Sequence, residues 1–364
     1  MSDLYRIDSH KLMYHPDRVA KWQENYDNWE KAKKIYPIYV EISPVGFCNH
    51  RCKFCALDFM EYKNIRLDFE KLKACLTDMA KNGVKSVMFA GEGEPALYKE
   101  LSEILDHCKN IGIDTSLTTN IVPFTDKTIE KFVRNCEWIK VSINGGTAEN
   151  YAYMHDTTED DFYRVLKNMK LAVSLKNKYN YLCTIGAQIL LVTDNYQTVE
   201  NLAKTVKDIG LDYLVIKPYS QHLSSHTDLY KDMDYSKYLY LEEQLKKYNS
   251  DNFSVIFRIN TMAKMFEEKE RYEKCGSVPY FWAYVMADGS VYGCSAFLGN
   301  EKFCYGNIHE QSFSEIWEGE RREKSDAFVK NELNIKECRV NCRMDEINRY
   351  LWDLKNPIKH VNFI

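Results

Sequence analysis

Short apolar runs alternate with amphipathic segments through the first two thirds of the chain. The runs predict β-strands at 38–42, 86–90, 115–118, 138–143, 184–191 and 213–217. The segments between them predict helices at 69–82, 98–111, 126–135, 160–176 and 197–209. Strands and helices that alternate in this way build β–α–β units with right-handed crossovers and a parallel sheet. The predicted fold class is therefore α/β, with an incomplete (β/α)6 TIM-like barrel as the main domain.

The pattern changes on both sides of this alternation. Residues 1–34 predict a charged helical lead-in, whose helix from Pro16 to about Lys33 should pack on the barrel exterior. Residues 35–250 form the predicted barrel. Residues 251–364 predict a small cysteine-rich domain, made of a β-hairpin plus helix, and the C-terminal tail. Its hairpin joins 282–286 to 290–294 through the turn Ala287-Asp288-Gly289.

Three cysteines follow the first predicted strand at C-x3-C-x2-C spacing, namely Cys48, Cys52 and Cys55. A loop can bring three thiolates so close in sequence onto one metal centre, and thiolate sulfur is the ligand of iron–sulfur clusters. A four-iron cluster held in this way would keep one iron open to a small molecule. An open coordination position usually marks a metal that does chemistry.

Other interpretations of the triplet are less favoured. Structural zinc normally has four protein ligands, and the nearest extra donor, His50, lies inside the triplet. Disulfides do not fit a chain that begins without an apolar signal segment, which predicts a reducing, cytoplasmic compartment. The formal net charge of -4 argues against nucleic acid as a partner. No stretch is long and apolar enough to predict a membrane span.

The triplet and the strand ends after it resemble the radical S-adenosylmethionine (SAM) superfamily, in which SAM binds the open iron of a [4Fe-4S] cluster. An aromatic residue before the third cysteine, here Phe54, is usual in that family, and Gly93-Glu94-Pro95 resembles its motif after the second strand. Glu92 departs from the pattern, because many relatives have a second glycine there. The resemblance implies further cofactor contacts at later strand ends, from Thr119, Asn120, Ser142, Asn144 and Gln188.

The C-terminal region resembles the auxiliary-cluster domain called SPASM, or its shorter twitch form. The resemblance lies in a C-x13-G-x4-C hairpin, a Gly-Asn-Ile and a Glu-Ile-Trp sequence, and a final C-x3-C pair. A full SPASM module has seven cysteines and this region has five, which implies one auxiliary [4Fe-4S] cluster held by Cys275, Cys294, Cys338 and Cys342. Cys304 is then a buried structural thiol. The cysteines that stand singly in predicted elements should be core residues: Cys75, Cys108, Cys136 and Cys183.

The resemblance implies a radical SAM oxidoreductase with a flavodoxin- or ferredoxin-type electron donor. Relatives with one twitch cluster include cyclitol and amino-sugar dehydrogenases, so the expected substrate is a sugar or cyclitol whose secondary alcohol is oxidised or epimerised. Similarity to those enzymes implies that Arg258 binds the substrate hydroxyl and helps to remove its proton. An exposed, ion-paired arginine is the alternative interpretation of Arg258.

Two other functions compete with this expectation. The first is peptide maturation, although a lead-in of 34 residues is too short for the peptide-binding domain that such maturases usually carry. The second is a non-catalytic iron–sulfur protein that passes electrons, in which the three-cysteine motif and Gly93-Glu94 would have no purpose.

Overall fold

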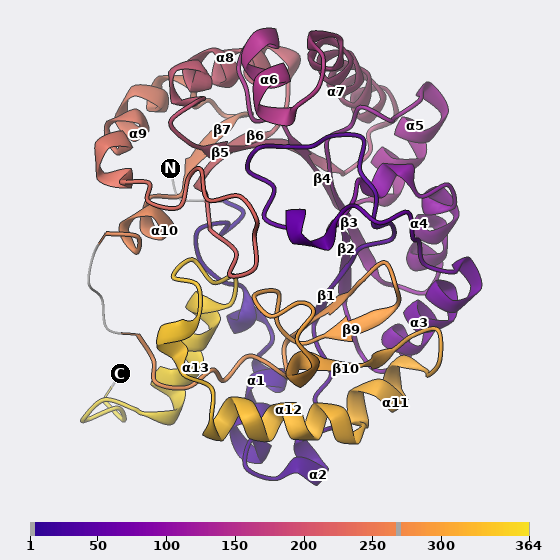
Figure 1. Ribbon diagram of the computed structural model, residues 1–364, viewed down its shortest axis with the longest axis vertical. Helices are drawn as coiled ribbons and strands as arrows, with labels where there is room; N and C mark the ends of the chain where they lie inside the picture. The colour runs from indigo at the N-terminus through magenta and orange to yellow at the C-terminus, as the bar shows by residue number, and fades with distance from the viewer. Residues whose placement is uncertain (1–3, 267–270, 364) are drawn as a thin grey trace.

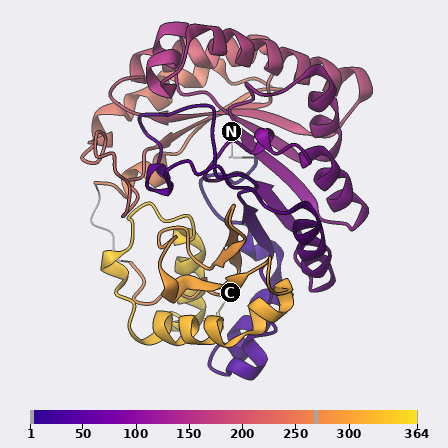
Figure 2. The same ribbon diagram turned by 45° about the vertical axis from the view of Figure 1, so that its right-hand side comes forward.

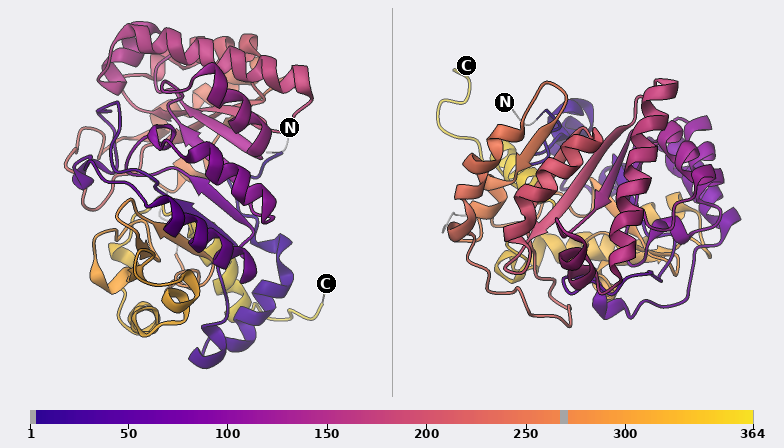
Figure 3. Two further views of the ribbon diagram at one scale, coloured as in Figure 1. Left: turned by 90° about the vertical axis from the view of Figure 1, so that its right-hand side faces the viewer. Right: turned by 90° about the horizontal axis from the view of Figure 1, so that it is seen from above.

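Ten strands form one continuous sheet in the computed structural model of the protein, which describes residues 4–266 and 271–363. Strands β1 to β7 are parallel, follow one another in space as in sequence, and curl into an open barrel (Figure 1; Figure 3). The six strands predicted from the apolar runs are present, and the parallel α/β barrel is confirmed. The strands are β1 (Tyr39–Ile42), β2 (Ser86–Phe89), β3 (Asp114–Thr119), β4 (Trp138–Ser142), β5 (Thr184–Leu191), β6 (Tyr213–Pro218) and β7 (Ser254–Phe257).

Helices surround the strands on the outer face of the curved sheet (Figure 1). Those that were predicted are α3 (Phe69–Lys81), α4 (Leu101–Asn110), α5 (Asp126–Asn135), α7 (Glu159–Tyr179) and α8 (Val199–Ile209). The helices α6 (Ala148–His155) and α9 (Tyr240–Leu245) complete the ring, and the first of them was not predicted, because its apolar residues show little helical periodicity. Among the described residues, no helix is long and apolar enough to cross a membrane.

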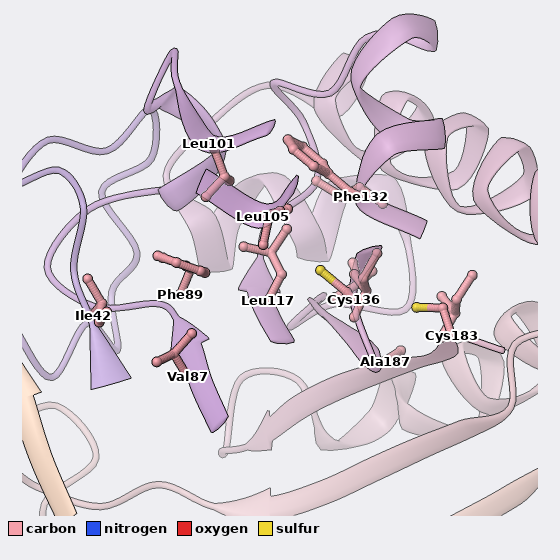
Figure 4. Close-up of a cluster of buried hydrophobic side chains, with 14 of the residues drawn as sticks. Ile42, Val87, Phe89, Leu101, Leu105, Leu117, Phe132, Cys136, Cys183 and Ala187 are labelled. Atoms are coloured by element: carbon pink, nitrogen blue, oxygen red, sulfur yellow. The ribbon is translucent and has the colours of Figure 1, made fainter. Parts of the chain in front are cut away.

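The main core lies between the strands and these outer helices. Figure 4 shows Phe89 of β2 and Leu117 of β3 close to Leu105 of α4, and each of these side chains is fully buried. Because successive side chains of a strand point to opposite faces, the alternate residues of each strand face the inside of the barrel. The single cysteines Cys75, Cys108, Cys136 and Cys183 all belong to this core, as predicted.

The barrel extends further along the chain than predicted. β7 pairs in parallel with β6, so it adds a seventh strand to the barrel instead of opening the cysteine-rich domain. The short helix α10 (Ile259–Ala263) follows it. We therefore place the domain boundary after residue 263 and not after residue 250. A strand of four residues does not show in its own sequence which strand it will pair with.

The cysteine-rich region continues the barrel sheet. Its first strand, β8 (Trp282–Val285), pairs in parallel with β1, and β9 (Ser290–Tyr292) and β10 (Cys304–Asn307) follow as antiparallel strands. The predicted turn between β8 and β9 contains Gly289 with a φ of 88°, a left-handed conformation that favours glycine. Three helices cover this region, namely α11 (Phe313–Glu318), α12 (Glu320–Asn331) and α13 (Asp345–Lys355) (Figure 2). β1 therefore has a barrel strand on one side and an auxiliary strand on the other.

The lead-in packs mainly on the cysteine-rich region, and the prediction that it covers the barrel exterior is wrong. It forms two helices, α1 (Pro16–Asn25) and α2 (Trp29–Ala32), where one helix was predicted. The chain turns between them because the Asn28 side chain caps a new helix. The buried Trp22 packs against Phe281, with ring centres 6.2 Å apart. The apolar face of the lead-in thus completes a second core under the auxiliary strands.

Candidate active site

The loop after β1 gathers the three predicted cluster ligands. Cys48, Cys52 and Cys55 are free thiols, and the negative charges that Cys48 and Cys55 would carry as thiolates disfavour ionisation of Cys52. Burial and then this repulsion raise the pKa of Cys52 well above its usual value, and burial raises the pKa of Cys48 to about 12. Bound iron would remove this penalty, because a coordinating metal stabilises the thiolate form. The loop therefore fits an iron–sulfur cluster.

Helix α6 holds this loop in place. The backbone carbonyls of Met154 and His155, at the C-terminal end of the helix, accept the N–H groups of Lys53 and Arg51 at 3.1 and 3.2 Å. These hydrogen bonds satisfy helix carbonyls that have no partner within the helix. The helix that the sequence did not predict is thus the support of the three-cysteine loop.

His155 also hydrogen-bonds one of the three thiols. Its Nδ1 lies 3.3 Å from Cys52 Sγ, and its Nε2 accepts the backbone N–H of Asn144 at 3.0 Å. A backbone N–H can only donate, so in the neutral imidazole the proton must lie on Nδ1. Burial and then the neighbouring His50 lower the pKa of His155 well below its usual value, which keeps the ring neutral. His155 therefore donates Nδ1–H to Cys52 Sγ.

We expect this hydrogen bond to raise the reduction potential of a cluster bound at Cys52, because donors to ligand sulfurs stabilise the more negative reduced state. His155→Phe should lower that potential, by on the order of tens of millivolts, in a redox titration followed by electron paramagnetic resonance. Tyr151→Phe is the matched control, since Tyr151 stacks on His155 at 4.2 Å but its hydroxyl bonds no described residue. An equal shift in both variants would contradict the assignment.

Glu94 joins the ends of the second and third strands. Its carboxylate accepts the hydroxyl of Thr119 and the backbone N–H groups of Asn120 and Ala96, the last two at 2.7 and 3.0 Å. Asn120 Nδ2 in turn donates to Asn49 Oδ1 in the cysteine loop at 2.9 Å. Burial raises the pKa of Glu94 to about 7. Residues predicted as separate cofactor contacts thus form one network that fixes the strand ends around the cysteine loop.

The structure gives a reason for the residue types at positions 93 and 92, next to Glu94. A Cβ on Gly93 would lie 2.1 Å from the carbonyl oxygen of Phe47, so the close approach of two backbones requires glycine there. Glu92 stands where many relatives have glycine, and its buried carboxylate accepts the backbone N–H of Ala287 at 2.9 Å. Ala287 lies in the turn between β8 and β9. Glu92 therefore ties the barrel to the cysteine-rich region.

The Glu92 carboxyl should make stability depend on pH. Burial raises the pKa of Glu92 from 4.5 to about 7. Between these values the folded protein holds a proton that the unfolded chain has lost, so the stability that this group contributes falls as the pH rises through that window. Glu92→Gln removes the titration and keeps an oxygen acceptor for Ala287. Relative to this variant, the wild-type protein should lose about 1 to 3 kcal/mol between pH 4.5 and 8 in denaturant titrations. Parallel stability profiles would contradict the expectation.

The remaining predicted cofactor contacts have different surroundings. Ser142 pairs in register with Gln188, and both side chains face the inside of the barrel, so they remain candidates. Asn144 is buried, and its Oδ1 accepts the backbone N–H of Leu190 at 2.7 Å. Its own backbone N–H donates to His155, so Asn144 helps to hold the imidazole in place. Phe54 is also buried, with its ring edge-on to His155 at 5.6 Å.

Arg258 has a partner that the sequence did not indicate. It lies directly after β7, and its Nε is 3.2 Å from Asp8 Oδ1. The arginine is ion-paired, as in the alternative interpretation, but it is partly buried and not exposed. The first interpretation, an arginine free to bind the substrate hydroxyl, also differs from the structure because the guanidinium already has a partner. A guanidinium stays protonated in proteins, and the geometry gives no support for removal of a substrate proton by Arg258. Its role in binding substrate stays a prediction.

A second set of thiols lines a small cavity in the cysteine-rich region. The pKa of Cys294 is raised well above its usual value by burial and then by the other three thiols of the set. Asn348 Nδ2 donates to Cys275 Sγ at 3.4 Å, and its Oδ1 accepts two backbone N–H groups beside that cysteine. Cys304 does not line the cavity. The four that do are those predicted from the twitch resemblance, Cys275, Cys294, Cys338 and Cys342.

Some residues of the two sites were missed by the sequence analysis. His155 lies more than a hundred positions after Cys52 and Asn348 lies 73 after Cys275, so neither occurs at a ligand spacing. Asn49 lies within the cysteine triplet, but an asparagine in a loop carries no distinctive signal. His155 could have been found from the sequence only if α6 had been predicted. That prediction would have placed His155 at a helix end next to the barrel mouth.

A parallel barrel with three thiols after its first strand and a separate group of four thiols defines an iron–sulfur enzyme class. The chain carries a radical SAM domain and, after it, a SPASM domain. The sequence model of the radical SAM superfamily matches residues 42–206, and that of the SPASM iron–sulfur cluster-binding domain matches residues 275–343. The cofactors of the chain are therefore a SAM-binding [4Fe-4S] cluster, an auxiliary iron–sulfur cluster and SAM.

Among curated proteins, the chain is similar to a tungsten-containing aldehyde ferredoxin oxidoreductase cofactor-modifying protein of Pyrococcus furiosus. The two are 22% identical over 299 residues, which cover 78% of this chain and 81% of that protein. A shorter match, to an S-adenosylmethionine-dependent nucleotide dehydratase of Lacinutrix mariniflava, is 32% identical over 108 residues. That match spans 28% of this chain and only 22% of the dehydratase.

Solved structures share the fold. Streptococcus suis SuiB bound to S-adenosylmethionine superimposes with a TM-score of 0.67 at 19% identity, over 88% of this chain and 75% of SuiB. The enzyme anSMEcpe with bound AdoMet gives a TM-score of 0.56 at 20% identity, over 88% of this chain and all of that protein. At these identities the likeness concerns the fold alone.

Proposed function

We propose that this protein oxidises a secondary alcohol of a carbohydrate-like small molecule by radical chemistry, or inverts its configuration. In this proposal Cys48, Cys52 and Cys55 hold three irons of the first cluster and leave the fourth to SAM. When bound and reduced, this pair of cofactors supplies a 5′-deoxyadenosyl radical that takes a hydrogen atom from the substrate. The electron would come from a flavodoxin- or ferredoxin-type donor in the cytoplasm.

The four thiols around one cavity are the observation that carries the oxidative reaction. Cys275, Cys294, Cys338 and Cys342 offer a ligand for every iron of an auxiliary [4Fe-4S] cluster, which would leave no position for substrate. A closed cluster suits electron transfer better than substrate binding. It would accept the second electron that oxidation of an alcohol releases after hydrogen abstraction.

The residues of the barrel would place the reactants. Ser142 and Gln188 face the inside of the barrel and offer hydrogen bonds to SAM. The network around Glu94 would hold its strand ends still, which positions SAM above the cysteine loop. Arg258, fixed at Nε by Asp8, would donate a hydrogen bond to the substrate oxygen.

Peptide modification is the second candidate function. It is favoured by the fold shared with SuiB, which has been solved bound to its precursor peptide SuiA, with a TM-score of 0.64 at 20% identity. A peptide substrate would also receive the radical at the barrel mouth. The two functions differ in the substrate from which hydrogen is taken.

The test is anaerobic reconstitution followed by hydrogen transfer. The reduced holoenzyme would be incubated with SAM and with sugars, cyclitols, sugar phosphates and nucleotide sugars that carry deuterium on their alcohol carbons. Deuterium in the released 5′-deoxyadenosine is the expected result for at least one of them. Absence of SAM cleavage under reduction would overturn the enzymatic proposal, and transfer only from a peptide would establish the second candidate.

A further inference from the structure

Strands β4 and β6 lie on the side of the barrel away from the auxiliary strands (Figure 1), and each carries a lysine. In β4, Ile139 and Val141 belong to the outer core, so Lys140 between them faces inward. In β6, Leu214 and Ile216 belong to that core, so Lys217 also faces inward. Two lysines from different strands thus share the space in which the proposed function places the substrate.

Two arginines join these lysines. The backbone N–H of Arg258 donates to the carbonyl of Ile216 at 2.9 Å, which places Arg258 beside Lys217 on the neighbouring strand. Arg339 lies in sequence between Cys338 and Cys342 and lines the auxiliary cavity, and its charge acts on Lys217 together with those of Lys140 and Arg258. The pKa of Lys217 is lowered well below its usual value, mainly by burial and further by these like charges. The pKa of Lys140 is lowered to about 8, mainly by burial and further by the charge of Arg258.

Among the described residues, only one of these basic side chains has an acidic partner. Asp8 offsets Arg258, as described above. Within the described part of the chain, neither Lys140 nor Lys217 has a hydrogen-bond or ion-pair partner, and the contact of Lys140 is with the Trp138 ring at 5.3 Å. Arg339 Nε is buried and has no hydrogen-bond partner among the same residues. These three basic side chains therefore receive no counter-charge from the described residues, and without one the two lysines tend to lose their protons.

An anionic ligand would keep these side chains in their charged form. Cations that are removed from water without a counter-ion cost several kcal/mol each, so a site of this kind is stable when a ligand supplies the opposite charge. SAM does not supply it, because its single carboxylate is offset by its own sulfonium. A phosphate ester brings up to two negative charges and three acceptor oxygens, and lysine and arginine are the side chains that bind phosphate in proteins.

We propose that the substrate carries a phosphate ester, and that Lys140, Lys217 and Arg339 bind the phosphate inside the barrel while its alcohol carbon faces SAM. This proposal rests on the proposed function, since it names the substrate class of the same site. Sugar phosphates and sugars linked to a nucleoside diphosphate share the required chemistry. The bound phosphate would hold the sugar by the end remote from the reacting carbon. This would orient the reacting C–H bond while the phosphate and its lysines stay away from the radical.

The experiment measures binding to the reconstituted holoenzyme by calorimetry, with no turnover needed. The probes are inorganic phosphate, inorganic pyrophosphate, a hexose phosphate, a nucleotide sugar and a hexuronate. Binding of at least one phosphate-containing probe is expected, with the hexuronate at least tenfold weaker. Lys140→Met and Lys217→Met should each weaken phosphate binding tenfold or more, and Lys217→Arg should restore most of it. Lys127→Met, which removes an exposed lysine of α5 on the outer face, is the matched control and should bind as the wild type does.

The outcomes separate this proposal from the proposed function. Lys217-dependent phosphate binding by a protein that never cleaves SAM would support the anion site and overturn the enzyme. Deuterium transfer from an unphosphorylated sugar, together with no phosphate binding, would support the enzyme and overturn the anion site. Preferred binding of the hexuronate or of an acidic peptide would also overturn the phosphate assignment. Circular dichroism and iron content of the lysine variants show whether they fold and load as the wild type does, and Lys217→Arg tests the charge if a methionine variant does not.

Discussion

Replacing Cys52 with alanine should abolish reductive cleavage of SAM. Its thiol is the middle one of the three in sequence and also accepts the hydrogen bond of His155, so its loss leaves the loop with only two thiolate ligands. Iron content should fall from about eight to about four per chain, because only the auxiliary cluster would remain. The measurements are iron quantitation and 5′-deoxyadenosine release after anaerobic reconstitution and reduction.

Cys108→Ala is the matched control for this prediction. Cys108 is fully buried in the outer core, on a helix far from the loop in sequence, and its removal costs packing but no ligand. This variant should keep its iron and its SAM cleavage. If Cys52→Ala still released 5′-deoxyadenosine at the wild-type rate, the assignment of the loop as the SAM-binding cluster would be wrong.

Replacing Cys294 with alanine should separate SAM cleavage from substrate oxidation. The auxiliary cluster would lose one of its four ligands, and iron content should again fall to about four per chain. The barrel cluster would remain, so 5′-deoxyadenosine would still form when a substrate is present. The oxidised product should disappear, since the substrate radical would have no acceptor for its electron.

Cys304→Ala provides the control for the auxiliary cluster. Cys304 is the fifth cysteine of that region but does not line the cavity, so iron content and product should be unchanged. Full product formation by Cys294→Ala would show that the net reaction needs no auxiliary electron acceptor. The role of the auxiliary cluster as electron acceptor would then be wrong.

Most of the barrel could be predicted from the sequence because its strands are buried on the helix side and its helices are amphipathic. The strand at 184–191, for example, has the bounds of β5. The three-cysteine group was predictable because close spacing brings the thiols of a short loop together, whereas the four auxiliary cysteines, spread over residues 275–342, were predicted only from the twitch resemblance. Pairing between strands was not predictable, and β7 and β8 were therefore assigned without their partners β6 and β1.

The contacts that surround the cysteines depend on tertiary structure in the same way. His155, Asp8 and Asn348 reach their partners only when distant segments pack together. Lys140 looks in sequence like one polar residue in a strand, and only the direction of its side chain shows that it faces inward with Lys217. Glu92 was recognised as a departure from the family pattern, but its bond to Ala287 needed the auxiliary turn to be in place.

The strand that leads into the SAM-cluster loop is held by β2 on one edge and β8 on the other. The two groups of cysteines are consequently carried by one continuous sheet, which passes from the barrel to the auxiliary region through β1. A chain cut after residue 263 would leave the edge of β1 without its partner, and such an uncovered edge invites association with other copies.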